Sequence, residues 1–416
     1  MSNSIRIAAV VVIALAGSTA RAGQPDSRTV VIGATLPLTG AEAKAGVAFK
    51  EGYELAIDEV NRAGGIEVRS GRLPVSLKIV DDQSSSELAI RLAQRLIDVD
   101  KAQLLLGTYS TSLVLAQSAV AEEAHVPYVN GGGAAAEIYR RTPRYVFGLL
   151  APVDLLAYSE MRWIEVQQTE GRLPTPLRIA ILWENTPHGK DFRSGILEFA
   201  SKTARRKGAY NVVLDDSFEM NAPDAKKIIA RLKAAKADVF LADAHLPDYI
   251  ALHKEYVAQK LCHAVVTYGA RGSERQAAET LGRDNVSYVL SAVWWNAAAS
   301  PGKPFAQSFK AKYQRSPEWY HALAYESARA LVTAVRKAGS ADREAVREQL
   351  GKLEMDSILP GGRLWFQEHQ AHYPFVVQQN QPDGTSPIVY PRELAEVAGT
   401  APNPRCVSGG FAQHVP

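Results

Sequence analysis

The sequence predicts an α/β protein of two lobes, in which each lobe is a parallel sheet covered on both faces by helices. Short apolar runs, rich in leucine and β-branched residues, alternate with longer segments of helical periodicity over most of the chain. Buried parallel strands have this composition, and strands that alternate with helices form doubly wound sheets. The alternation occurs in two successive series, and the roughly 390 residues that follow the N-terminal leader exceed the usual size of one domain.

The N-terminus has the pattern of a secretory signal. Arg6 gives a weakly positive start, residues 7–16 are an unbroken apolar run, and Ala20-Arg21-Ala22 fits the small-x-small cleavage rule. The apolar run is too short to span a bilayer, so we predict cleavage near Ala22 and a periplasmic location for the mature chain. An uncleaved membrane anchor is the alternative.

The two series predict the elements of the two lobes in chain order. In the first series we expect strand 30–34, helix 47–63, strand 75–80, helix 88–99, strand 104–106, helix 113–124, strand 126–129 and strand 145–149. In the second series we expect helix 155–168, strand 177–183, helix 189–207, strand 212–214, helix 224–235, strand 239–242, helix 247–259 and strand 264–268.

Two successive strand-to-helix turns mark the part of the first series where a ligand would bind. One places Ser110, Thr111 and Ser112 at the start of a helix, and the other places the glycine-rich residues 130–134 before a short helix. Such turns present free backbone N–H groups and lie at the carboxyl ends of parallel strands. The pattern predicts either an anion site or, more simply, helix caps and chain turns.

Charge and cysteine content narrow the possible functions. The sequence has 47 Lys and Arg residues and 44 Asp and Glu residues. Two of the arginines lie in the leader, so the mature chain is nearly neutral. Near-neutrality does not favour nucleic-acid binding. Cys262 and Cys406 are far apart in the sequence, and an oxidising compartment favours a disulfide between them over two separate thiols.

The sequence contains no pattern for a catalytic centre or a cofactor. It has no Gly-x-Ser-x-Gly elbow and no glycine loop that ends in Gly-Lys-Ser/Thr. His369 with His372, and His253 with His263, lack companion ligands at zinc spacing, so we interpret them as surface or cleft histidines and expect no metal.

Two further pairs have a simpler and a functional interpretation. Asp81-Asp82 forms an acid pair at a strand end, where it more simply caps the next turn or contacts a neighbouring loop. Trp294-Trp295 either packs in the core or presents one ring to a cleft, where it would stack on an unsaturated ligand.

Short motifs are spread over most of the mature chain. They are Ile32–Gly40, Glu59–Ile66, Asp81–Ser84, Gly107–Thr111, Val126–Val129 with Gly132, Tyr145–Phe147, Ala180–Leu182 with His188-Gly189, and Trp319–Ala322 with Ala324-Tyr325. Each is weak alone, but in this order behind a signal peptide the set is specific. It resembles the periplasmic solute-binding proteins of branched-chain amino-acid ABC transporters, which are type I periplasmic binding proteins.

The resemblance implies two lobes joined by three crossings, with a ligand held in the cleft between them. The crossings would lie near Leu149, Val293 and Phe366. The implied division is a signal peptide at 1–22, a first lobe at 23–148 and 296–365, a second lobe at 149–295 and 366–398, and an irregular tail at 399–416.

The resemblance also implies where the first lobe would hold a ligand carboxylate. In the amino-acid-binding members a hydroxyl in the first loop and backbone amides in the next loop do this. These positions fall on Thr111, with Tyr109 and Ser110 beside it, and on Gly132, Gly133 and Ala134. Ala134 and Ala45 replace a family threonine and a family tyrosine, so two contacts are lost.

The second lobe departs further from the family. Family tyrosines that face the ligand fall on His188 and near His245, and the glutamate that holds the ligand ammonium falls near Gly269 or Ala270, where no acid stands. Arg271 is close by instead. Trp294 is the expected stacking face.

Residues and resemblance together predict a monomeric extracytoplasmic receptor of an ABC importer that delivers a small carboxylate-bearing ligand to a membrane permease. The ligand would be an amino acid or an aromatic or dicarboxylic acid, and binding would depend on pH between about 5 and 8 through the two cleft histidines. The alternatives are an exported hydrolase or amidase that acts on small acids, for which a nucleophile–base set is missing, and a ligand sensor that uses the same clamp.

Overall fold

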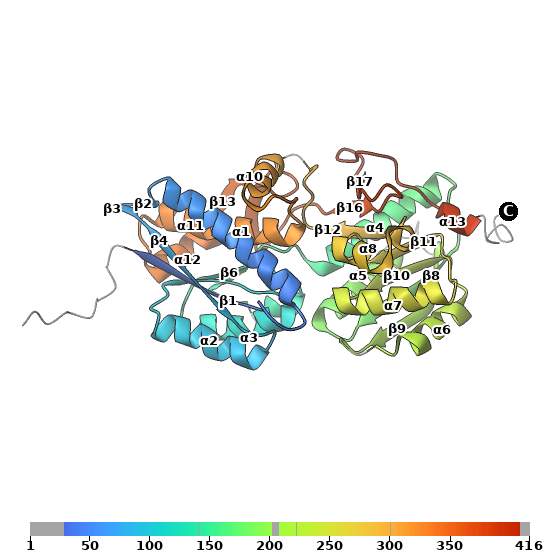
Figure 1. The fold of residues 1–416 in the computed structure, drawn as a ribbon, viewed down its shortest axis with the longest axis horizontal. Coiled ribbons are helices and arrows are strands. Elements are labelled where there is room, and N and C mark those ends of the chain that lie inside the picture. Colours follow the sequence, from blue (N-terminus) through green and yellow to red (C-terminus); the bar gives the residue numbers. More distant parts are fainter. Residues whose placement is uncertain (1–28, 141, 202–207, 222, 300, 408–416) are drawn as a thin grey trace, which may run out of the picture.

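The computed structural model describes residues 29–140, 142–201, 208–221, 223–299 and 301–407. They form two lobes side by side, the first made of the blue, cyan and orange segments in Figure 1 and the second of the green, yellow and red ones. Each lobe is built on one large sheet. The expected signal peptide lies outside the described residues, and no described helix is long and apolar enough to cross a membrane.

The first lobe has an eight-stranded sheet with helices on both faces. Its strand order is β13-β14-β15-β7-β6-β5-β1-β4. The strands are β1 Val30–Leu36, β4 Val75–Asp81, β5 Leu104–Leu106, β6 Tyr128–Asn130, β7 Val146–Gly148, β13 Glu354–Asp356, β14 Arg363–Gln367 and β15 Gln370–Ala371, beside a separate hairpin of β2 Ile66–Val68 and β3 Gly71–Leu73. The helices are α1 Ala43–Arg62, α2 Ser86–Asp98, α3 Thr111–Glu123, the short η1 Ala136–Ile138, α10 Lys303–Tyr313, α11 Trp319–Ala338 and α12 Arg343–Gly351.

The second lobe has a seven-stranded sheet in the order β17-β16-β12-β11-β10-β8-β9. The strands are β8 Leu177–Glu184, β9 Tyr210–Phe218, β10 Val239–Asp243, β11 Val265–Tyr268, β12 Leu290–Val293, β16 Val376–Gln379 and β17 Ile388–Tyr390. The helices are α4 Val153–Thr169, α5 Pro187–Ser201, α6 Ala225–Ala235, α7 Leu246–Ala258, α8 Arg275–Leu281, α9 Arg283–Val286 and α13 Pro404–Val407. The prediction of an α/β protein with two parallel-dominated, doubly wound sheets is confirmed.

The buried strands explain why the sheets form where they do. All residues of β5 and all residues of β10 are buried, because helices cover both faces of each sheet. Such strands carry continuous apolar runs rather than an alternating pattern. Helices α2 and α6 start at capping side chains: Ser85 accepts a hydrogen bond from Leu88 N, and Asp224 accepts one from Lys227 N.

Three chain segments pass between the lobes, and the third lies later than expected. Phe366 was expected at the crossing, but it sits in β14, which pairs with β13 and β15 on the edge of the first sheet. The chain therefore leaves the first sheet after Ala371 and enters the second at Val376. The hairpin is retained in the first lobe because β15 pairs with β7.

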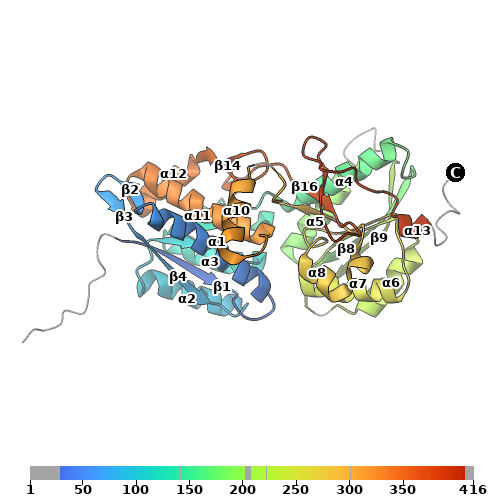
Figure 2. The ribbon, with the colours of Figure 1, turned by 45° about the horizontal axis from the view of Figure 1, so that its top comes forward.

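The crossings are tied to one another by buried hydrogen bonds. The Tyr373 hydroxyl in the third crossing donates to Leu149 O in the first at 2.7 Å. Trp294 Nε1 in the second crossing donates to Ala151 O in the first at 2.9 Å. These bonds hold the three strands of the hinge together, and Figure 2 shows the narrow neck between the lobes near β16.

The tail is more ordered than the sequence indicated. Cys262 and Cys406 form a disulfide, which fixes α13 against the segment before β11. Asn403 N also donates to Ala264 O at 2.9 Å. The pairing favoured by the sequence is therefore present, and the end of the described chain belongs to the second lobe.

Close packing of α1 against α11 places one side of the functional site. A Cβ at Gly52 would lie 2.4 Å from His321 O and 2.7 Å from Ala324 Cβ, so only glycine permits this contact. The first turn of α11 carries Trp319 and Tyr320, whose rings lie between the lobes.

We predict that Gly52→Ala destabilises the protein by about 1–3 kcal/mol, because the helices must move apart by a distance that the packed core resists. Gly351→Ala is the matched control, since no atom lies within 4 Å of a Cβ there. Denaturant unfolding of both variants measures the difference. Equal stability of the two variants would contradict the close-packing argument.

Candidate functional site

The loops that follow β5, β6, β8, β10 and β11 meet between the lobes around a tight cavity of about 10 Å³, which has room for about one water molecule. Ligands bind at the carboxyl ends of parallel strands in such sheets. The cavity is lined by Tyr109, Ser110, Thr111, Gly132, Leu150, His188, His245, Arg271, Trp294 and Trp319. Sequence reasoning named all of these except Leu150 and Trp319.

The first lobe contributes hydroxyls and backbone N–H groups. Ser110 is the N-cap residue of α3, Thr111 is its first helical residue, and both side chains are buried. The Ser110 and Ser112 hydroxyls lie 3.2 Å apart, while Ser112 itself is exposed. Because the first N–H groups of a helix have no partner within it, this corner favours an anionic group.

The second loop reaches the cavity only through Gly132. A Cβ at Gly132 would lie 2.0 Å from Thr108 O, so glycine lets the two loops touch. We expected Gly133 and Ala134 to contact the ligand together with Gly132, but neither residue lines the cavity. Gly133 N turns back to Asn130 Oδ1, and Ala134 O accepts a hydrogen bond from the Gln370 side chain.

The second lobe contributes two histidines, each paired with the acid of the neighbouring strand. Glu184 ends β8 and binds His245, which follows β10, with Oε2 to Nδ1 at 2.5 Å and Oε1 to the backbone N at 2.5 Å. Asp243 ends β10 and binds His188, which follows β8, with Oδ2 to Nδ1 at 2.8 Å. Because β8 and β10 are adjacent parallel strands, the acid at the end of each strand binds the histidine that follows the other strand.

These contacts set the charge of His245. Burial by itself lowers the pKa of this imidazole, but the charges of Glu184 and Glu42 and the hydrogen bond to Glu184 outweigh burial and raise the pKa to about 9. The His245 side chain is therefore an imidazolium over the whole range from pH 5 to 8. This raised pKa argues against a titration of His245 between pH 5 and 8, and the pH dependence of binding through the two histidines stays a prediction.

Arg271 crosses the cavity from the second lobe to the first. Its guanidinium is buried, donates to the Tyr109 hydroxyl, and lies 5.8 Å from the ring centroids of both Tyr109 and Trp319. Among the residues that the structure describes, Arg271 Nε and Nη1 and Trp319 Nε1 are buried without an acceptor. Buried donors are rarely left unpaired in a folded protein, so these three nitrogen atoms, with four N–H groups, are available to a ligand.

The two neighbouring tryptophans have different roles. Trp294 lines the cavity, with its ring 5.0 Å from Trp319 and 6.5 Å from His188. Trp295 packs in the core against Phe305 and donates from Nε1 to Ile358 O at 3.1 Å. Core packing is confirmed for Trp295, whereas stacking of Trp294 on an unsaturated ligand stays a prediction.

Asp243 is the acid that sequence reasoning missed. The family glutamate was expected near Gly269, and a Cβ at Gly269 would lie 2.5 Å from Asp243 Oδ1. An acid therefore stands at this place, but it comes from the adjacent strand and lies behind His188. The signal in the sequence was an acid at the end of an otherwise apolar strand, Val239–Asp243.

Polar contacts between the lobes close the cleft around the cavity. Glu274 of the second lobe binds Lys44 Nζ at 2.6 Å and accepts from the Tyr320 hydroxyl at 2.5 Å. Asp191 Oδ2 accepts from Ala136 N at 2.8 Å. The structure is therefore the closed form, in which both sets of loops contact one another.

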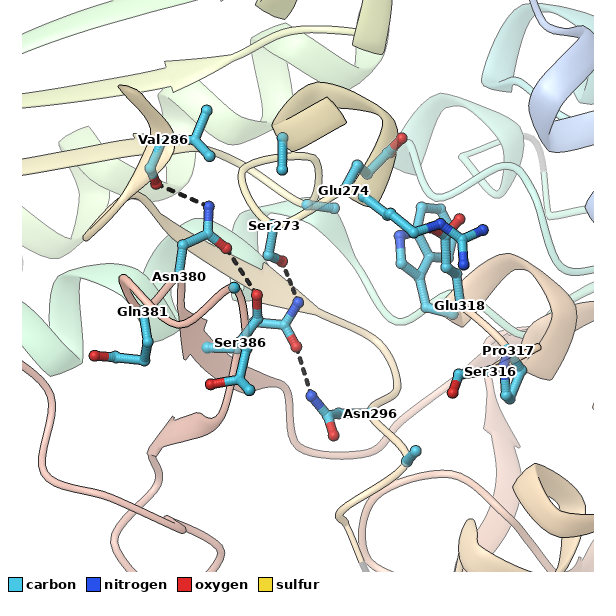
Figure 3. Close-up of a pocket in the computed structure, with 18 of the residues that line it drawn as sticks. Ser273, Glu274, Val286, Asn296, Ser316, Pro317, Glu318, Asn380, Gln381 and Ser386 are labelled. Carbon is cyan, nitrogen blue, oxygen red and sulfur yellow. Dashed lines mark hydrogen bonds between the residues drawn. The ribbon is translucent and has the colours of Figure 1, made fainter. Parts of the chain in front are cut away.

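A larger hollow, of about 520 Å³ and open to solvent, is also lined by Trp319. Figure 3 shows that its side chains bind one another: Asn296 Nδ2 donates to Gln378 Oε1 at 2.6 Å, and Ser386 donates to Asn380 Oδ1 at 2.8 Å. Because these amides already have partners, the smaller cavity with its unpaired donors is the better candidate site.

The remaining candidate groups are structural. Asp81 accepts from Leu38 N at 2.9 Å, as expected for a contact with a neighbouring loop.

His253 and His263 are not surface or cleft residues, because they are buried in the second lobe. Burial lowers the pKa of each imidazole to about 4. Within the described ranges no group of three His, Cys, Asp or Glu could hold a metal ion.

Comparison with known proteins identifies the family. The model of the periplasmic binding protein family matches residues 29–385. A Leu/Ile/Val-binding protein homolog 7 of Brucella suis is 27% identical over 385 residues, which cover 89% of this chain and 94% of that protein.

Solved structures share the fold. The branched-chain amino acid transporter substrate-binding protein LivJ of Streptococcus pneumoniae, in complex with isoleucine, superposes with a TM-score of 0.75 at 17% identity and covers 87% of this chain and 100% of its own. An ABC transporter solute-binding protein of R. palustris, in complex with benzoate, gives 0.73 at 19% identity and covers 87% and 95%. The chain therefore belongs to the periplasmic binding protein family and is similar in sequence and fold to its branched-chain amino-acid ABC transporter members.

Proposed function

We propose that this chain is the extracytoplasmic receptor of an ABC importer, which binds a small carboxylate-bearing ligand between its lobes, without chemistry, and delivers it to a membrane permease. The observation that carries the proposal is the buried guanidinium of Arg271, whose Nε and Nη1 have no acceptor among the described residues. The helix start at Ser110 and Thr111 supplies a second set of donors across the same cavity.

The chemistry of the cavity favours an aromatic or dicarboxylic acid over an α-amino acid. Most groups that face the cavity are donors or cations. Asp243, the nearest acid to the family's ammonium position, binds His188 through Oδ2, while its Oδ1 is buried without a donor among the described residues. Trp294 and Trp319 supply flat apolar faces. The benzoate complex of the R. palustris protein supports an aromatic acid, whereas the isoleucine complex of the LivJ protein supports the alternative of an amino acid.

Ligand-induced thermal stabilisation tests the proposal with benzoate, succinate, glutarate, L-leucine and L-isoleucine as probes. A ligand at a hundredfold excess over its dissociation constant stabilises the folded state by about 2.7 kcal/mol, which raises the melting temperature measurably. We expect a rise with at least one of the acids and none with leucine. Stabilisation by leucine alone would overturn the choice of ligand class.

Thr111→Val should weaken binding of the acid found in that screen about tenfold to a hundredfold, because it removes a hydrogen bond to a charged group. Ser112→Ala should have little effect, since the Ser112 side chain is exposed and its hydroxyl contacts only Ser110 in the described structure. Calorimetric titration of both variants gives the ratio, and equal affinities would assign the contact to another hydroxyl.

Arg271→Gln should weaken the same binding by at least tenfold, because the buried charge and its free N–H groups are lost together. Arg275→Gln is the matched control, since Arg275 is exposed four residues further along the chain. Thermal unfolding without ligand is measured in parallel, so that a loss of stability is separated from a loss of contact. Retention of full affinity by Arg271→Gln would remove the main support for the proposal.

A further inference from the structure

Glu184 is fully buried and is not part of the cavity surface. Both of its carboxylate oxygens bind the same residue, since Oε1 accepts from the backbone N of His245 and Oε2 faces Nδ1 of its ring, each at 2.5 Å. The two contacts fix the ring at the N-terminal end of α7, with its other nitrogen, Nε2, on the side of the cavity. Nothing in the sequence marked this residue, which ends a long apolar strand.

We propose that Glu184 is a positioning residue that holds His245 as a cation and thereby gives the cavity a fixed positive charge for an anionic ligand. The expected effect on ligand affinity rests on the proposed function, because a fixed positive charge in the cavity strengthens binding only if the ligand is an anion. Its structural part, the control of His245 by Glu184, is independent of any ligand.

The geometry distinguishes Glu184 from the other acids near His245. In the imidazolium form, the Nδ1–H group donates to the Glu184 carboxylate and the Nε2–H group remains free to donate to a ligand. Glu42 Oε1 is 3.9 Å from Nε2, too far for a hydrogen bond, and Asp243 is engaged by His188. Only Glu184 binds the His245 ring directly among the described residues.

The charged groups around His245 come from every element packed against it. They are Glu184 of β8, Glu42 before α1, Asp243 of β10, Asp248 of α7, His188 of α5 and Arg271 after β11. Burial raises the pKa of Asp248 to about 6, and the neighbouring charge of Glu184, with which Asp248 shares a hydrogen bond, raises it in the same direction. Of the others, Arg271 opposes the imidazolium and Glu42 supports it, but neither contacts the ring within hydrogen-bond distance.

Proton NMR of the full mature protein tests the structural part without ligand. The His245 ring signal is assigned by its absence from His245→Gln and is followed from pH 6 to pH 10. In the parent protein we expect a midpoint near 9. In Glu184→Gln, which keeps the size of the side chain but removes its charge, burial then dominates and the midpoint should fall below 7.

Asp243→Asn is the matched control, because it makes the same acid-to-amide change on the neighbouring strand. It alters the partner of His188 and leaves Glu184 in place, so the His245 midpoint should stay above 8. Glu184→Asp retains the charge and should restore a midpoint above 7. A parent midpoint near 6.5, or an unchanged midpoint in Glu184→Gln, overturns the proposal, and the parent result decides it even if the variant does not fold.

Binding of benzoate between pH 7 and pH 9.5 tests the consequence, in a range above the titration of Asp248. In the parent protein the affinity should be constant to about pH 8 and fall about tenfold as the pH passes 9, because the cation is lost there. Glu184→Gln should bind about tenfold more weakly at pH 7 and show no further fall. A step near pH 9 that persists in the variant overturns the role of Glu184. If benzoate binds neither protein, this acid fails as a ligand, and the NMR titration still decides the inference.

Discussion

The burial of one guanidinium between two lobes governs the chemistry of the site. A buried charge is costly unless it is paired, hydrogen-bonded or placed against polarisable faces. Arg271 has the rings of Tyr109 and Trp319 on one side and the charge of Asp243 nearby, but it uses only part of its donor capacity. In the closed form these N–H groups are left without an acceptor among the described residues, and an anion would satisfy them.

The reciprocal pairing of acids and histidines follows from the same constraint. Asp243 and Glu184 lie behind His188 and His245, so each cationic or polar ring that faces the cavity has a carboxylate on its far side. The second lobe then presents N–H donors to the cavity while each of the two rings keeps a carboxylate partner. Recognition of an anion in this arrangement depends on directed N–H groups at short range and much less on a long-range positive field.

Particular residues show how far the sequence determined the fold and where it did not. The alternation of apolar runs and helices, and the turns at Ser110 and Gly132, depend on local composition, so the strands and the cavity-lining loops of the first lobe were predictable. The third crossing was not, because the pairing of β14 with β15 depends on a contact between segments far apart in the chain. Glu184 was missed for a similar reason, since its partner His245 is 61 residues away and follows another strand.

The two lobes contribute different donors to the cavity: the first lobe contributes the start of α3, and the second contributes Arg271 and His245. The donors of the first lobe, at the start of α3, are fixed on one rigid element and are present whether the cleft is open or closed. The charged donors, Arg271 and His245, reach the cavity only when the second lobe meets the first. A ligand shifts a conformational equilibrium only by its difference in affinity for the two states. A molecule that satisfies the first corner alone would bind both forms alike, whereas one that also accepts from Arg271 and His245 would favour the closed form. His188 and His245, which replace family tyrosines, and Arg271, which is close to the place of the family's glutamate, all lie in the second lobe. Under the proposed function, we therefore expect this lobe to select the ligands that close the cleft.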